Sequence, residues 1–308
     1  MCIMVKFISH FCMYNTQRCK DMLNGLDLLK ALRRLRIRSL NDPIEDEFRG
    51  WNYGSPPVKP KAYLGLAVSD LANRFCPSNR DLYLKYVEKV RAEPNQLMVN
   101  GKAYHEALMS AIRDVRSLVI KGVDGSRIID VLLRKKLNFN VENAAKLYRF
   151  AVLQLAAEVD RGLSKANIQG VDAALSMLPQ LVEVEVDGSP IGLSSHLRVD
   201  ALSGNVLFEV KTGAKNEKHR LALAGYALAM ECDREIPVDY ALLVYVDPAP
   251  KTPRLSIVPV YISNELRQDF LELRDEVVDM IHSERDPGLA NSCPSTCPFY
   301  RFCRGEVA

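Results

Sequence analysis

The chain has 308 residues, of which 48% are hydrophobic, so it can bury a sizeable core as one large domain or two smaller ones. Its 41 Lys and Arg against 38 Asp and Glu leave a net charge of +3, which by itself does not indicate a nucleic-acid partner. No run reaches the roughly 20 apolar residues of a membrane span, and no signal-peptide pattern opens the chain, which disfavours membrane and secreted proteins.

Eight cysteines in a chain of this length do not make a disulfide-rich secreted scaffold. Their uneven spacing instead favours a metal site and a cytoplasmic, reducing location. Residues 1–21 contain alternative starting methionines, and we treat them as an uncertain N-terminal extension.

The predicted elements begin with a basic amphipathic helix over residues 22–40, where leucines recur at helical spacing among lysine and arginines. Its charged face is either solvated or contacts phosphate or a partner protein. Residues 50–60 are rich in Gly and Pro and predict a loop. Residues 69–165 are expected to be mostly helical, with Ser69 and Ser78 as N-caps and helical periodicity over 103–120 and 144–159.

The hydrophobic period then changes from helical to alternating. Residues 182–213 predict a small antiparallel sheet, with hairpin-type turns at Asp187-Gly188 and at residues 203–205. A helix over 215–231, strands over 239–246 and 255–262, and an amphipathic helix over 263–284 are expected to follow. The succession predicts an α/β fold.

Two carboxylates and a lysine are predicted to converge in this sheet. Asp200 and Glu209 lie on strands joined by a tight turn, and Glu209 and Lys211 project from the same face of theirs. Such an arrangement suits Mg²⁺ or Mn²⁺ and the hydrolysis of a phosphodiester. The alternative is a cross-strand ion pair of little energetic value, but the apolar flanks of Glu209 favour burial, where unpaired charges are costly.

Three cysteines, Cys293, Cys297 and Cys303, lie within eleven residues of each other near the C-terminus, two of them followed by proline. A fourth ligand is needed, and Cys76 is the best candidate because it is also followed by proline, whereas Cys232 fits an ordinary buried thiol. Four thiolates suit either zinc or an iron–sulfur cluster, and the one-plus-three spacing favours a 4Fe-4S cluster.

A series of short motifs runs along the chain. The motifs are E-F-R-G-W at 47–51, P-P-V-K-P at 56–60, V-S-D at 68–70, F-C-P-S-N-R-D at 75–81, G-x3-H-E at 101–106, R-V-D at 198–200, E-V-K at 209–211 and the closing cysteines. Each motif alone is weak, but their order is specific. In this order they resemble the RecB-like exonucleases of CRISPR adaptation, the fourth CRISPR-associated protein family, and most closely its archaeal type I-A variant. The resemblance extends from residue 26 to the C-terminus.

The resemblance implies a restriction-endonuclease-like core of the PD-(D/E)xK class and a 4Fe-4S cluster on Cys76, Cys293, Cys297 and Cys303. It also implies Mg²⁺ or Mn²⁺ held by His105, Asp200, Glu209 and Val210, with Lys211 and Tyr226 completing the catalytic set. The implied activity is trimming of single-stranded DNA ends on new-spacer fragments, together with the CRISPR integrase and its small partner protein. One departure is Ala222, where the family carries glutamine.

These expectations divide the chain into the extension over 1–21, a mainly helical region with the first cluster cysteine over 22–165, the nuclease core over 166–285 and the cluster tail over 286–308. The alternative to a nuclease is a DNA-end-binding module of the integration complex with little or no catalysis. A zinc-stapled nuclease from repair or helicase systems is a third possibility.

Overall fold

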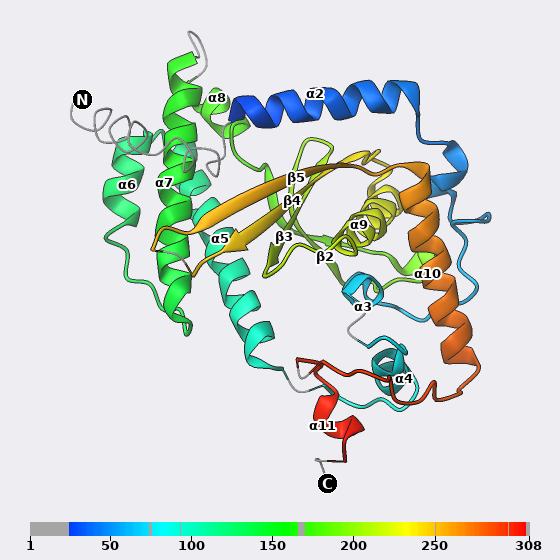
Figure 1. Cartoon of the computed structure of the whole chain (residues 1–308). Helices are drawn as coiled ribbons and strands as arrows, with labels where there is room; N and C mark the ends of the chain where they lie inside the picture. The colour runs from blue at the N-terminus through cyan, green and yellow to red at the C-terminus, as the bar shows by residue number, and fades with distance from the viewer. Residues whose placement is uncertain are drawn as a thin grey trace.

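The computed structural model describes residues 25–73, 76–92, 94–165, 170–249, 251–294 and 296–305 (Figure 1). The predicted extension over 1–21 lies outside these residues. No helix among the described residues is long and apolar enough to cross a membrane.

A five-stranded sheet in the order β1-β2-β3-β4-β5 forms the centre of the structure (Figure 1). The strands β3 and β4 are parallel, and every other neighbouring pair is antiparallel. The α/β class predicted from the sequence is therefore confirmed, with a mixed sheet. The strands are β1 (Leu181–Val186), β2 (Leu197–Ser203), β3 (Val206–Thr212), β4 (Tyr240–Asp247) and β5 (Arg254–Tyr261).

The two predicted turns of the sheet have different outcomes. Residues 204–205 join β2 to β3 in a tight turn, as predicted, and Gly204 takes the positive φ of 55° that such turns require. Asp187-Gly188 does not form a hairpin turn, because the short 3-10 helix η4 (Ser189–Ile191) lengthens the connection. Arg274 donates to the main-chain oxygen of Ile191 there, so the longer connection is held by the core.

Ten α-helices and two further short 3-10 helices are described around the sheet. They are α2 (Gly25–Asn41), η2 (Asp46–Phe48), η3 (Gly50–Asn52), α3 (Val68–Asn73), α4 (Arg80–Tyr86), α5 (Gln96–Ile120), α6 (Gly125–Leu132), α7 (Glu142–Lys165), α8 (Gly170–Ser176), α9 (His219–Arg234), α10 (Asn264–His282) and α11 (Tyr300–Cys303).

The predicted N-caps Ser69 and Ser78 are wrong. Ser69 lies inside α3, and α4 begins after Asn79, whose φ of 60° is left-handed. The Ser78 hydroxyl instead donates to the main-chain oxygen of Gly288, a contact with the far end of the chain. Ser263 caps α10 and accepts from the main-chain nitrogen of Leu266, so the helix predicted from residue 263 begins one residue later.

The two faces of the sheet have separate hydrophobic cores. On one face α3, α9 and α10 pack against residues that include Leu207, Leu243 and Tyr245. On the other face α5, α6, α7 and α8 pack against residues that include Val244 and Val246. The boundaries predicted for the domains stay a prediction, although the first core joins Val58 and residues near it to the sheet.

The predicted basic helix is present as α2, which packs along the edge strand β5 (Figure 1). The guanidinium of Arg38 lies over the Tyr261 ring, and the Ser39 hydroxyl pairs with the hydroxyl of Tyr240 at 2.5 Å. Arg33, Arg34 and Arg36 are exposed. The inner face of α2 therefore covers the sheet edge while its charged face meets solvent.

Candidate active site

The sheet brings Asp200 and Glu209 together as predicted. The β2–β3 ladder pairs Ala201 with Phe208, so Asp200 and Glu209 are the next residues on the two neighbouring strands, and the charge of Asp200 acts on Glu209. Both carboxylates are buried. Lys211, two residues along β3, forms an ion pair with Glu209 in which its Nζ is 2.7 Å from Oε1.

The helix α5 delivers His105 to the same place from outside the sheet. Its Nε2 lies 2.7 Å from Oδ1 of Asp200, and the other Asp200 oxygen accepts from the main-chain nitrogen of Val210 at 2.6 Å. A Cβ at Gly101 would lie 3.3 Å from the Thr212 hydroxyl, so a residue without a side chain lets α5 approach the end of β3 closely. The structure thus unites His105, Asp200, Glu209 and Lys211.

The pKa values of Glu209, His105 and Lys211 are all raised, but for different reasons. Burial raises the pKa of Glu209 to about 7, and the neighbouring charge of Asp200 adds to the effect, whereas Lys211 opposes it. Burial opposes the charged forms of His105 and Lys211, but their carboxylate partners outweigh it and raise both pKa values. The negative charges of Asp200 and Glu209 therefore dominate the electrostatics of the site, even with His105 and Lys211 beside them.

One carboxylate oxygen in this site has no partner. Oε2 of Glu209 is buried and makes no hydrogen bond. A buried oxygen of this kind beside a second carboxylate fits a bound cation, because a divalent metal would satisfy it and reduce the repulsion. Among the described residues no three His, Cys, Asp or Glu side chains are already arranged around a metal position. In this structure His105 contacts Asp200 and Lys211 contacts Glu209.

The remaining predicted site residues are Val210 and Tyr226, and Ala222 is the position at which the chain departs from the family. Val210 has no ligating side chain, so only its main-chain oxygen could bind a metal. The Tyr226 hydroxyl pKa is raised well above 10 by burial, with the charges of Glu209 and Asp200 contributing, which places Tyr226 close to both. Ala222 lies one turn earlier on α9 and is buried in the core.

Tyr245 is a neighbour of the site that the sequence reasoning missed. It pairs with Lys211 in the parallel β3–β4 ladder, and its hydroxyl lies 3.1 Å from Nδ1 of His219, at the start of α9. Burial and the nearby Lys211 charge lower the His219 pKa to about 4. Only the register of the parallel pair could have revealed Tyr245, because β4 reads as a continuous apolar run.

The predicted cluster cysteines lie within electrostatic range of one another. Burial raises the thiol pKa values of Cys297 and Cys303, and Cys76 adds to both. Cys293 adds to the effect on Cys303. All four are free thiols, and Cys232, on α9, is also free but contributes to neither pKa. Thiols of this kind suit an iron–sulfur cluster or zinc, but the described residues include no group of three cysteines arranged around a metal position, so the cluster stays a prediction.

Polar contacts attach the tail to the rest of the molecule beside these cysteines. Arg80 donates to both oxygens of Asp286, with its Nη2 2.8 Å from Oδ2. The Asn95 amide donates to the main-chain oxygen of Thr296 at 2.6 Å, and buried Phe299 packs against Tyr83 and Leu84. The tail therefore bridges α4 and the start of α5 (Figure 1).

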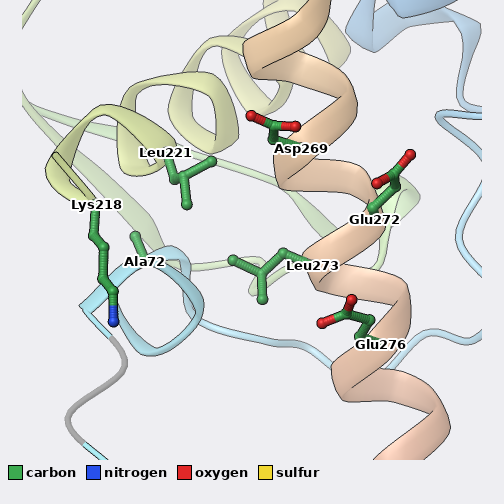
Figure 2. A pocket seen from close by; sticks show the side chains of 7 residues that line it. All are labelled: Ala72, Lys218, Leu221, Asp269, Glu272, Leu273 and Glu276. Carbon is green, nitrogen blue, oxygen red and sulfur yellow. The ribbon is translucent and has the colours of Figure 1, made fainter. Parts of the chain in front are cut away.

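A separate groove lies between α3, α9 and α10, with a volume of about 260 Å³. Figure 2 shows three carboxylates of α10 along it and Lys218 on the opposite side. None of the predicted site residues lines it, and its charge would repel a nucleic-acid backbone. Its lining residues are Ala72, Lys218, Leu221, Asp269, Glu272, Leu273 and Glu276.

Comparisons with known proteins show relatives of nearly the whole chain. Residues 22–306 match the family described as CRISPR-associated exonuclease Csa1. A protein of that description from Thermoproteus tenax is 37% identical over 287 residues, which are 92% of this chain and 100% of the relative. Another from Saccharolobus solfataricus is 34% identical over 280 residues, 87% of this chain and 95% of the relative.

A solved structure described as a candidate exonuclease, from Eubacterium rectale, is 12% identical with a TM-score of 0.38, covering 83% of this chain and 92% of that chain. A TM-score of this size supports no conclusion about fold or activity.

Proposed function

The chain belongs to the family of CRISPR-associated exonuclease Csa1, and from that premise we propose that it is a metal-dependent DNA nuclease. The observation that carries the proposal is the unpartnered, buried Oε2 of Glu209 beside Asp200. A protein that needed this carboxylate only for stability would gain more from a fully paired or apolar side chain. A cation site explains why the charge is retained.

Each residue of the site would have its own role in hydrolysing a phosphodiester. Asp200, Glu209 and His105 would hold the metal, together with the main-chain oxygen of Val210. A bound Mg²⁺ or Mn²⁺ supplies a more acidic water and neutralises charge on the phosphate. Lys211, which pairs with Glu209 beside the proposed metal position, would donate to a phosphate oxygen or to the attacking water.

Support for the finer proposal comes from the strand arrangement and the family together. Two antiparallel strands carrying Asp200 and Glu209, followed by a helix and a parallel strand, fit a restriction-endonuclease-like core. We infer that the substrate is single-stranded DNA at the ends of new-spacer fragments. The partners in that reaction are the CRISPR integrase and its small partner protein.

We also propose a 4Fe-4S cluster on Cys76, Cys293, Cys297 and Cys303 as a second, structural cofactor; its support is the one-plus-three spacing and the influence of Cys76 on the pKa values of Cys297 and Cys303. Cys76 precedes α4, and the other three lie on the tail that Arg80 and Asn95 attach. A cluster on these thiols would close the chain's tail onto α4 and the start of α5. Protein purified without oxygen is expected to be brown and to contain four iron and four sulfide per chain, and a colourless protein with one zinc per chain would contradict the assignment.

The metal proposal is tested by titrating Mn²⁺ into the protein and measuring the free ion by electron paramagnetic resonance. Loss of an outer-shell partner already weakens metal sites about 10- to 100-fold, so Glu209→Gln and Asp200→Asn should each weaken binding by at least about tenfold. Glu142→Gln, which removes an exposed carboxylate at the start of α7, should leave the affinity unchanged. Equal affinities in all four proteins would overturn the assignment of the site.

A further inference from the structure

The first turn of α5 exposes three consecutive apolar side chains. Leu97, Met98 and Val99 are 62%, 43% and 44% exposed. Single exposed apolar residues are ordinary, but three in a row at a helix end give a contiguous apolar tip. This tip is held in place, because the Asn95 side chain caps α5 and also donates to the tail at Thr296.

The tip lies on the same helix as the candidate active-site residue His105. Met98 and His105 are seven residues apart on that helix, so they lie on the same face about 10 Å from each other. Gly101 lies between them on that face and approaches Thr212, the residue after Lys211 on β3. A DNA strand that is bound at His105 and runs toward the start of α5 would contact Met98.

The surface around the tip has the chemistry to hold an unpaired strand. Methionine is flexible and polarisable and makes favourable contacts with aromatic rings, which nucleobases also provide. Lys102, one turn beyond Met98, is exposed and has no ion-pair partner among the described residues, so it is free to meet a phosphate. Bases in a duplex are already stacked on one another and would not reach such a tip.

We propose that the apolar tip of α5, formed by Leu97, Met98 and Val99, binds unpaired nucleobases of the DNA that enters the site. It thereby gives the enzyme its preference for single strands over duplex. This inference rests on the proposed nuclease function, which supplies the substrate. The tip would contact the nucleobases, whereas the active-site residues would contact only the phosphates.

The test removes the side chains of the tip and the nucleobases of the DNA, separately and together, and compares the binding affinities. Binding of a fluorescent oligothymidylate is compared with that of the same strand carrying abasic positions, in Lys211→Ala protein so that no cleavage occurs. Replacing Leu97 and Met98 by alanine should weaken binding of the normal strand by at least about fivefold, the lower range for one stacked base, and leave the abasic strand nearly unchanged. Ile120→Ala is the matched control, because Ile120 ends the same helix and is also 62% exposed.

An equal loss on both strands would overturn the inference, because the tip would then act without the bases. An unchanged affinity for both strands would overturn it too and would leave the tip as a surface for a protein partner. Failure of the nuclease proposal looks different, since the wild-type protein would then cleave no DNA whatever the binding cycle showed.

Discussion

At the scale of single residues, burial and nearby charges change the protonation of Glu209 and His219. Glu209 has a pKa of about 7 because of burial and Asp200, while His219 has one of about 4 because of burial and the Lys211 charge. His219 is thus neutral at neutral pH and can accept or donate one hydrogen bond to Tyr245. Lys211 therefore influences two groups whose charged forms burial disfavours.

The neutral state of His219 should make the fold sensitive to acid. The pKa falls from 6.5 to about 4 on folding, so the stabilisation is complete above pH 6.5 and is lost as the pH falls toward 4. His219→Gln keeps a polar partner for Tyr245 but cannot be protonated. We expect the free energy of unfolding, measured with urea, to fall less between pH 6.5 and 4 in the variant than in the wild type.

The wild-type protein serves as the reference at each pH, since His105 and Glu209 titrate in both proteins. Parallel pH profiles for wild type and variant would show that His219 is not held neutral by the fold.

At the scale of elements, a buried guanidinium joins the helices that cover one face of the sheet. Arg267, on α10, binds both oxygens of Glu231 on α9, at 2.7 Å and 2.9 Å, and also donates to the main-chain oxygens of Phe48, Val238 and Ile262. Both side chains are fully buried. Since every donor of Arg267 is used, the pair fixes α9 relative to α10 and so fixes the helix that covers the site.

Removing this guanidinium should be strongly destabilising. Arg267→Met leaves the Glu231 carboxylate buried with Arg49 as its remaining cation, and breaking a buried ion pair costs about 3–5 kcal/mol. Arg127→Met, at an exposed position on α6, should cost less than about 0.5 kcal/mol. Urea unfolding of both variants checks this, and similar midpoints for the two would contradict a central place for the Arg267 pair.

The alternating and helical patterns predicted most elements to within a few residues. The strand predicted over 239–246 is Tyr240–Asp247, and the helix over 263–284 is Asn264–His282. The helix expected from residue 215 begins at His219, because its first residues form a loop in which the Asn216 side chain accepts from the Lys218 main chain. Ser78 misled the N-cap prediction because its hydroxyl is used by a residue 210 positions away, which no local pattern reveals.

At the scale of the whole molecule, the chain's tail contacts the segment that contains α4 and the start of α5. Ser78, Arg80 and Asn95 all bond to residues after 285. The candidate site and the apolar tip of α5 thus lie on a helix whose start is attached to the cysteine-bearing tail. If the proposed cluster joins Cys76 to the tail, its loss should affect how DNA reaches the site without altering the carboxylates.

Loss of one cluster cysteine should loosen the tail. Cys76→Ser is expected to let trypsin cut after Arg304 several times faster than in the wild type, with a stable fragment left behind. Cys232→Ser is the matched control, because Cys232 is a free thiol on α9 that influences neither Cys297 nor Cys303. Mass spectrometry of the early digest measures both rates, and equal rates in the two variants would argue against a clamp at Cys76.

The candidate site was predictable where neighbouring strands carry it and not where distant elements do. Asp200, Glu209 and Lys211 follow from one hairpin and its period of two. His105 came from a family motif, and only the structure shows its contact with Asp200 from α5. Tyr245 and the tip at Met98 depend on tertiary placement, so neither carries a signal in the sequence alone.

The most direct test of the central claim is digestion of end-labelled single-stranded DNA by protein purified without oxygen, in the presence of Mn²⁺. Lys211→Ala and Asp200→Ala, with iron content matched to the wild type, should each lose at least about 100-fold in rate, since single charge-stabilising groups contribute that much. Glu142→Gln should cleave as the wild type does. DNA binding without cleavage by any of these proteins, with the iron centre intact, would contradict the nuclease and favour a DNA-end-binding module.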